Sequence, residues 1–187
     1  MGPSSKIIII QHNCAGSSFI FHSLFSTLFN VDIVAIQDPY LWNGIPLSAP
    51  GFSIIFPPVT NVQKVRVCLY ISNRFIAYSK VSFFPLFFNR DDICGVNFRF
   101  PSVYFGSFNS FTCINVYNRN RQGSDTHYIP PPIIFNEVSH PTCIVGDFNM
   151  HHQPQNPSRI ISYNQKAAAN KYFQCATAQG FSTINTP

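Results

Sequence analysis

The amino-acid sequence predicts an α/β fold in which two β-sheets stack on each other and helices lie outside them. A β-branched run, an amphipathic helical stretch and a second apolar run follow one another within about thirty residues, as in an α/β layer. Several short strand-like runs then follow, with few helical patterns between them. The 187 residues suit one domain, and the 45% of hydrophobic residues supplies a sizeable core.

The first elements have the clearest patterns. Lys6 to Gln11 (KIIIIQ) is a continuous β-branched run, which predicts a fully buried strand. A helix capped by Ser17 or Ser18 follows. Its apolar face consists of Phe21, Leu24, Phe25 and Leu28. Ile33 to Gln37 (IVAIQ) predicts a second buried strand, and Asp38 to Pro50, which is rich in proline and glycine, predicts a loop.

The rest of the chain is predicted to be mostly strands, followed by one helix. The predicted strands are Phe52–Phe56, Arg66–Ser72, Phe75–Phe84, Asp92–Phe100, Phe111–Tyr117 and Thr142–Gly146. Asn164 to Gln179 is an Ala-rich helical stretch with Gly180 as its C-cap, and Phe181 to Asn185 begins another strand. Because the sequence stops where a strand begins, we expect the single domain, residues 1–187, to be incomplete at its C-terminus.

Charge and cysteine usage restrict the partners and the compartment. Only 10% of residues are charged, and the net charge of +5 suits either a polyanionic partner or an ordinary basic domain. The six cysteines form no CxxC pair, and most lie in apolar runs, which predicts buried reduced thiols and an intracellular chain. Since no apolar run reaches membrane length, we expect no membrane partner.

The densest group of reactive side chains follows the strand-like run TCIVG. The sequence there reads Gly146-Asp147-Phe148-Asn149-Met150-His151-His152. A glycine lets the chain turn sharply at a strand end, and polar side chains at the carboxyl end of a strand commonly line a site in α/β proteins. The alternative is a polar turn in which Asp147 caps the backbone.

This motif resembles that of the endonuclease/exonuclease/phosphatase superfamily, and most of all that of LINE-type (non-LTR) retrotransposon endonucleases. Five further segments resemble motifs of these domains and occur in the same order. They are Gln11-His12-Asn13, Ile36-Gln37-Asp38-Pro39-Tyr40, Val65-Arg66-Val67-Cys68-Leu69-Tyr70, Asp92-Ile93-Cys94-Gly95-Val96 and Asn115-Val116-Tyr117-Asn118. The resemblance runs from about Ile7 to Asn185. It implies a DNase I-like, four-layer sandwich of two β-sheets flanked by helices, missing its last strands.

The resemblance implies a metal-dependent phosphodiesterase that nicks DNA. Asn13 and Asp38 would hold a divalent ion, Mg²⁺ or Mn²⁺, and Asn115 and Tyr117 would contact the scissile phosphate. Oxygen ligands suit such hard cations, which neutralise charge on phosphoryl oxygens, and neutral donors bind the phosphate without repelling the attacking water.

The remaining roles that the resemblance implies concern the attacking water and the substrate. Asp147 would orient or activate the water, and Asn149 would stabilise the phosphate in the transition state. His151, His152 and Arg66 would line the substrate site.

Four of these residues also have ordinary structural interpretations. Asn13 could cap the first helix, and Asn115 could be a bulge residue in a strand. Tyr117 could be a half-buried core ring, and Arg66 a surface charge. These alternatives stay open on the sequence alone.

Two departures from the family pattern predict impaired catalysis. Asp38 stands where the family has glutamate, which is one methylene longer, and magnesium demands near-ideal geometry. The family's last motif, Ser-Asp-His, supplies the histidine base, and no histidine follows His152. Since acid–base catalysis contributes roughly 10²–10⁴-fold, we expect a weak enzyme.

Three functions therefore compete. The first is an impaired retrotransposon endonuclease whose partners are DNA and a downstream reverse transcriptase domain in a longer product, in the nucleus. The second keeps the fold and cleaves phospholipid headgroups or inositol phosphates. The third is a catalytically inactive nucleic-acid-binding protein or a decayed retrotransposon remnant.

Overall fold

The structure, a computed structural model, describes residues 6–58, 64–83, 90–101, 108–118, 134–135, 141–149 and 163–182. The chain divides into two compact units. The first unit comprises Met1–Tyr117 and Ser139–Asp147, and the second comprises Asn118–Val138 and Phe148–Pro187. That residues 1–187 form one domain stays a prediction.

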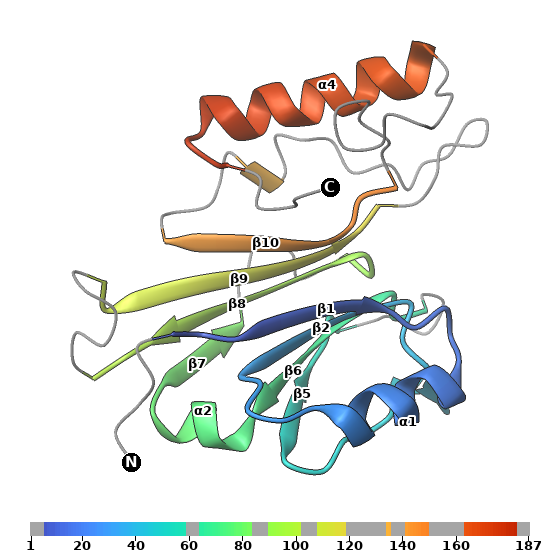
Figure 1. Cartoon of the computed structure of the whole chain (residues 1–187), viewed down its shortest axis with the longest axis vertical. Helices are drawn as coiled ribbons and strands as arrows, with labels where there is room; N and C mark the ends of the chain where they lie inside the picture. Colours follow the sequence, from blue (N-terminus) through green and yellow to red (C-terminus); the bar gives the residue numbers. More distant parts are fainter. Residues whose placement is uncertain are drawn as a thin grey trace. The chain divides into compact units, whose positions relative to one another are not determined.

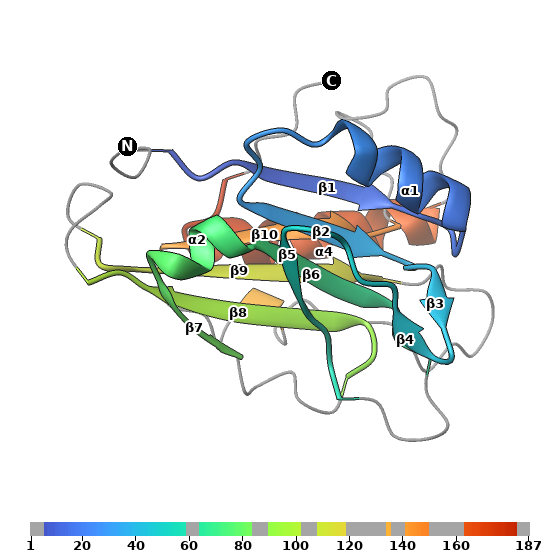
Figure 2. The same ribbon diagram turned by 90° about the horizontal axis from the view of Figure 1, so that it is seen from below.

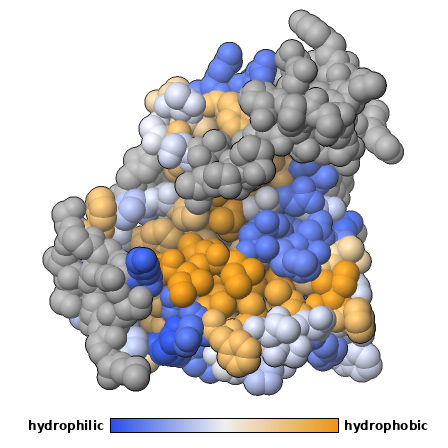
Figure 3. Space-filling model, in the orientation of Figure 1, coloured by the Kyte–Doolittle hydropathy of each residue, from blue (hydrophilic) through white to orange (hydrophobic). Residues whose placement is uncertain are grey.

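The first sheet of the first unit has the strand order β1-β2-β6-β5 (Figure 1). Its strands are β1 (Ile9–Asn13), β2 (Ile33–Gln37), β5 (Phe52–Ile55) and β6 (Val67–Ser72). β1 and β2 are parallel, and the other neighbours are antiparallel. The prediction of a fully buried first strand was wrong, because β1 is an edge strand and is only half-buried. Figure 3 shows apolar side chains gathered on the face that carries β1.

The second sheet has the strand order β10-β9-β8-β7. Its strands are β7 (Lys80–Phe83), β8 (Ile93–Arg99), β9 (Ser110–Tyr117) and β10 (Thr142–Asp147). β9 and β10 are parallel. The two sheets stack over one hydrophobic core, in which Ala35, Leu69 and Ile71 of the first sheet pack with Val96 and Phe98 of the second (Figure 2). The predicted pair of stacked sheets is therefore confirmed.

Helix α1 (Ser18–Thr27) packs against β2 and β6 through a second hydrophobic cluster, with Phe21 buried in it. Ser17 caps the helix as predicted, since its hydroxyl oxygen accepts a hydrogen bond from the backbone N–H of Ile20 at 3.3 Å. The Phe21 ring lies 5.8 Å from the Tyr70 ring. The predicted helix between the first two strands is confirmed.

Two predictions for the segments between strands were wrong. The predicted strand Phe75–Phe84 begins instead as a short helix, α2 (Asn73–Ala77), and only β7 is extended. The helix forms because the Ser72 hydroxyl accepts from the N–H of Phe75 at 3.2 Å. The predicted loop after Asp38 contains a hairpin of β3 (Leu41–Trp42) and β4 (Ile45–Pro46).

In the second unit, helix α4 (Tyr163–Ala178) confirms the predicted C-terminal helix. Gly180, with φ 77°, ends it in a Schellman motif, in which Phe181 N–H donates to the Ala176 carbonyl at 2.9 Å. Tyr172 is buried and packs against Phe135 and Phe148. Of the strand predicted to start at Phe181, residues 181–182 do not belong to a strand and 183–187 lie outside the described residues. No helix in the described ranges is long and apolar enough to cross a membrane.

Candidate active site

Polar side chains collect where the parallel strands of each sheet end. Asn13, the last residue of β1, pairs in register with Gln37, the last residue of β2, and Asp38 follows directly. In the second sheet, Tyr117 and Asp147 end β9 and β10 and pair with each other. Because parallel strands end at one edge of a sheet, each sheet presents its polar residues together.

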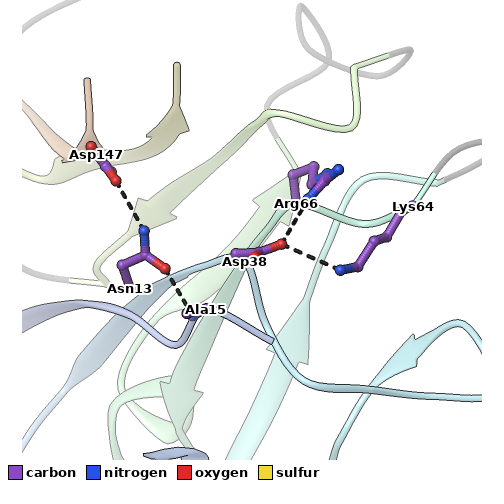
Figure 4. Close-up of polar contacts among 6 residues, drawn as sticks. All are labelled: Asn13, Ala15, Asp38, Lys64, Arg66 and Asp147. Carbon is purple, nitrogen blue, oxygen red and sulfur yellow. Dashed lines mark hydrogen bonds and ion pairs between the residues drawn. The ribbon is translucent and has the colours of Figure 1, made fainter. Parts of the chain in front are cut away.

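A hydrogen bond joins these two edges. The side-chain amide of Asn13 donates from Nδ2 to Oδ2 of Asp147 at 2.9 Å (Figure 4). The oxygen of the same amide is also held, because Asn13 Oδ1 accepts a hydrogen bond from the backbone N–H of Ala15 at 2.9 Å. Asn13 therefore aims its donor at the carboxylate. It does not cap α1, because Ser17 does so.

Asp38 lies in the left-handed region, with φ 42°, and forms two ion pairs. Its Oδ1 accepts from Arg66 Nη1 at 2.8 Å and from Lys64 Nζ at 3.4 Å (Figure 4). The Arg66 side chain is only 26% exposed. The interpretation of Arg66 as a mere surface charge is therefore wrong, and the predicted metal ligand has two cations on one of its oxygens.

Asn115 links the two sheets beneath this edge. It is fully buried, and its Nδ2 donates to the carbonyls of Ile36 and Cys68, each at 2.9 Å. Its Oδ1 accepts from the side-chain amide of Gln37. It pairs in regular register with both neighbouring strands, so it is not a bulge residue. The predicted contact between Asn115 and a phosphate would require these buried bonds to break.

Tyr117 combines a core role with a place at the edge. Its ring is half-buried and packs against the core between the sheets, as the structural alternative predicted. Its backbone N–H donates to the Asp92 carbonyl at 2.9 Å, and the N–H of Arg66 donates to the Asp91 carbonyl at 2.9 Å. The Asp91-Asp92 turn therefore binds the backbones of both sheets next to the site. Arg90 holds this turn with two 2.8 Å bonds to the Asp92 carboxylate.

Gly146 lets β10 approach β9 closely. Its φ is 150°, and a Cβ at this position would lie 2.0 Å from the Val116 carbonyl oxygen. Gly146 lies within β10 and not in a turn after the strand. Glycine is therefore needed here because β10 lies so close to β9. Asp147 owes its position opposite Tyr117 to this approach.

Three further predicted residues belong to the second unit or lie outside the described residues. Asn149 belongs to the second unit, where its Nδ2 donates to the Asn118 carbonyl at 2.7 Å. His151 and His152 lie outside the described residues. The structure thus brings together Asn13, Asp38, Arg66, Tyr117 and Asp147.

Sequence reasoning missed three residues near the edge: Lys64, Arg90 and Asp91. Each is a charged residue just before a strand, which is the only signal that they carry in the sequence. That signal is common on any protein surface.

The fold can be compared with known structures. The chain is similar to the endonuclease domain of TRAS1, a telomere-specific non-LTR retrotransposon, with a TM-score of 0.69. The similarity covers 96% of this chain and 75% of that one, at 13% sequence identity. This chain has a DNase I-like fold. The fold expected from the sequence motifs is confirmed, although no family model and no curated protein matches the sequence.

On this DNase I-like fold, the donors fit a divalent cation in kind. Asp38 offers a carboxylate, and Asn13 offers an amide oxygen, which are ligands that Mg²⁺ and Mn²⁺ accept. Asp38 Oδ2 has no hydrogen-bond or ion-pair partner among the described residues. The described part of the chain contains no group of three or more His, Cys, Asp or Glu side chains that could hold a metal. With two cations already at Asp38 Oδ1, we expect weak affinity for a further cation.

Cys14, between Asn13 and the start of α1, reports the electrostatics of this edge of the DNase I-like fold. Burial, and then the negative charge of Asp38, raise the pKa of its thiol to about 11. A thiol with this pKa stays protonated at neutral pH and is a poor nucleophile. The reactive groups of the edge are therefore its oxygens and cations.

Proposed function

We propose that this chain is an endonuclease domain that cleaves phosphodiester bonds in DNA with the help of a divalent cation. The observation that carries the proposal is the 2.9 Å bond between Asn13 and Asp147, which joins the strand ends of two sheets with Asp38 beside them. The similarity in fold to a retrotransposon endonuclease domain supports it. A downstream reverse transcriptase domain in a longer product belongs to the same proposal.

The residues of the edge divide the chemistry between them. Asp147 supplies a carboxylate whose direction Asn13 fixes, and it orients the attacking water. Arg66 and Lys64 supply positive charge for the phosphate. Held by Asp38 and Asn13, Mg²⁺ or Mn²⁺ would neutralise the charge that develops on the phosphoryl oxygens.

We propose further that the activity is low and requires a high metal concentration. Arg66 and Lys64 lie 2.8 and 3.4 Å from Asp38 Oδ1 and compete with a divalent cation for the same carboxylate. Aspartate is also shorter than the glutamate of the related pattern, so the carboxylate reaches less far toward a metal.

A second candidate function, DNA binding without cleavage, is favoured by the same ion pairs. A carboxylate already neutralised by two fixed cations repels a phosphate less, and the chain carries a net charge of +5. This candidate predicts salt-sensitive binding and no metal-dependent strand breakage.

A substrate panel distinguishes these possibilities. Supercoiled plasmid DNA, an inositol phosphate and a phospholipid are each incubated with the chain at increasing Mg²⁺, with EDTA as the metal-free control. We expect slow plasmid nicking that EDTA abolishes and that Asp147→Asn lowers roughly 100-fold. Salt-sensitive binding without nicking would establish the second candidate. Hydrolysis of the inositol phosphate or the phospholipid alone would contradict both.

A further inference from the structure

The hairpin beside the candidate site carries an exposed aromatic side chain. Trp42 in β3 is 64% exposed, and its cross-strand partner Ile45 in β4 is 55% exposed. The other pair of the hairpin, Leu41 and Pro46, is half-buried and buried. Because side chains alternate between the two faces of a strand, the hairpin turns one apolar pair inward and the other toward solvent.

Several contacts order the backbone of the hairpin that carries Trp42. Its turn residues, Asn43 and Gly44, both have positive φ (51° and 79°), as the tight two-residue hairpin turn requires. Leu47 N–H donates to the Tyr40 carbonyl at 3.4 Å and closes the base of the hairpin. The hydroxyl of Tyr70 in β6 donates to the Leu47 carbonyl at 2.6 Å. The backbone at Trp42 therefore loses little conformational entropy when the ring binds a partner.

The hairpin lies next to that end of the first sheet at which the candidate site is found. Figure 2 shows β3 and β4 next to the carboxyl end of β2. Trp42 follows Asp38 by four residues, so their Cα atoms lie within about 14 Å of each other. A nucleotide unit offers a charged phosphate and a flat base within such a distance. Lys64, whose side chain is 47% exposed, and Arg66 carry the positive charge that complements the phosphate.

We propose that Trp42 stacks on an unpaired base of the DNA strand whose phosphate lies at the Asn13–Asp147 edge. The inference rests on the proposed function and specifies its substrate. A base inside a duplex has both faces covered by its neighbours, so stacking on Trp42 requires DNA with a locally unpaired or unstacked base. Inositol phosphates and phospholipid headgroups have no aromatic face, so the exposed ring favours nucleic acid over them.

Trp42 is the only tryptophan of the chain, so its fluorescence tests the inference directly. The full chain is titrated with a single-stranded oligonucleotide and with an abasic strand of the same length, and fluorescence anisotropy of the labelled strands gives both affinities. We expect the base-carrying strand to quench the Trp42 emission and the abasic strand to leave it unchanged. Both strands carry the same phosphates, so the difference isolates stacking.

Variants of the full chain complete the test. Trp42→Ala is expected to weaken binding of the base-carrying strand about fivefold or more and to leave binding of the abasic strand unchanged. Trp42→Phe retains an aromatic face and is expected to keep most of the affinity. Phe29→Ala removes an aromatic side chain that is 81% exposed after α1, outside the hairpin, and is expected to change neither affinity.

Three results would overturn the inference. Binding of the base-carrying strand with unchanged Trp42 emission would refute stacking and leave the proposed function standing. Failure to bind either strand, together with failure to nick plasmid DNA, would remove the proposed function and the inference with it. Quenching by anionic phospholipid vesicles and not by the oligonucleotide would assign the hairpin to a lipid surface.

Discussion

Asn13 Nδ2 donates a 2.9 Å hydrogen bond to Asp147 Oδ2, although 134 positions separate the two residues along the chain. The bond connects the last residue of β1 to the last residue of β10, and thus one sheet to the other. It orients the carboxylate of Asp147 on the same edge as Asp38 and its ion-pair partner Arg66 (Figure 4). The proposed catalysis depends on this convergence.

The cations at Asp38 are expected to limit metal binding. Lys64→Ala removes one positive charge 3.4 Å from Asp38 Oδ1 and should lower the Mg²⁺ concentration for half-maximal nicking about two- to fivefold. The effect is modest because Lys64 is 47% exposed and screened by solvent. Lys80→Ala, an exposed lysine of β7, serves as the matched control. An unchanged Mg²⁺ requirement in Lys64→Ala would show that the ion pair does not compete with the metal.

Gly146 is expected to tolerate no side chain. In Gly146→Ala the new Cβ would lie 2.0 Å from the Val116 oxygen, and relieving this contact should cost about 3 kcal/mol of unfolding free energy or more. Gly44→Ala is the matched control, because Gly44 also has positive φ but open space around it, and it should cost about 1 kcal/mol. Urea denaturation followed by circular dichroism measures both. Equal losses of unfolding free energy in the two variants would show that the positive φ alone, and not the contact with Val116, explains the cost of Gly146→Ala.

Asn115 is expected to act mainly through stability. Asn115→Ala leaves the buried carbonyls of Ile36 and Cys68 without their donor and should lower the unfolding free energy by about 3 kcal/mol. Asn109→Ala, at an exposed position, should change it by less than about 0.5 kcal/mol. A stable Asn115→Ala variant with a raised KM for DNA would instead assign Asn115 a direct contact with the phosphate.

Alkaline pH is expected to destabilise the chain. Burial, followed by the charge of Asp38, raises the pKa of Cys14 from 9.0 to about 11, so the folded state holds this proton more tightly than the unfolded state. The resulting stability is fully present below pH 9 and is lost between about pH 9 and 11, by up to about 1.4 kcal/mol per pH unit. Urea denaturation from pH 7.5 to 10.5 measures the slope, which should be shallower in Cys14→Ala. An unfolding free energy independent of pH in this range would contradict the prediction.

Many elements of both units were predictable because their signals are local. The apolar run of β2, the serine cap of α1 and the glycine after α4 each mark an element within a few residues. The β3-β4 hairpin was missed because its strands have two residues each, although Asn43-Gly44 is a strong hairpin signal. Helix α2 was missed because five residues in a Phe-rich segment also suit a strand.

The candidate site was only partly predictable. Asn13, Asp38 and Asp147 were chosen through resemblance to a family, and the structure brings them to one edge. The ion pairs of Asp38 and the buried bonds of Asn115 depend on how the two sheets stack, which the local sequence does not determine. The resemblance assigned Asn115 to the phosphate without its buried bonds, and no local pattern marked Lys64 as a partner of Asp38.

A double-mutant cycle, measured by the nicking of supercoiled plasmid DNA, tests most directly whether a single site cleaves DNA. Asn13→Ala, Asp147→Ala and the double variant are compared with the original chain at saturating Mg²⁺, with circular dichroism to confirm folding. If the two side chains act as a unit, the double variant nicks no more slowly than Asp147→Ala, which is roughly 100-fold impaired. Nicking that survives in Asp147→Ala, or losses that multiply in the double variant, would contradict a single site built on the Asn13–Asp147 bond.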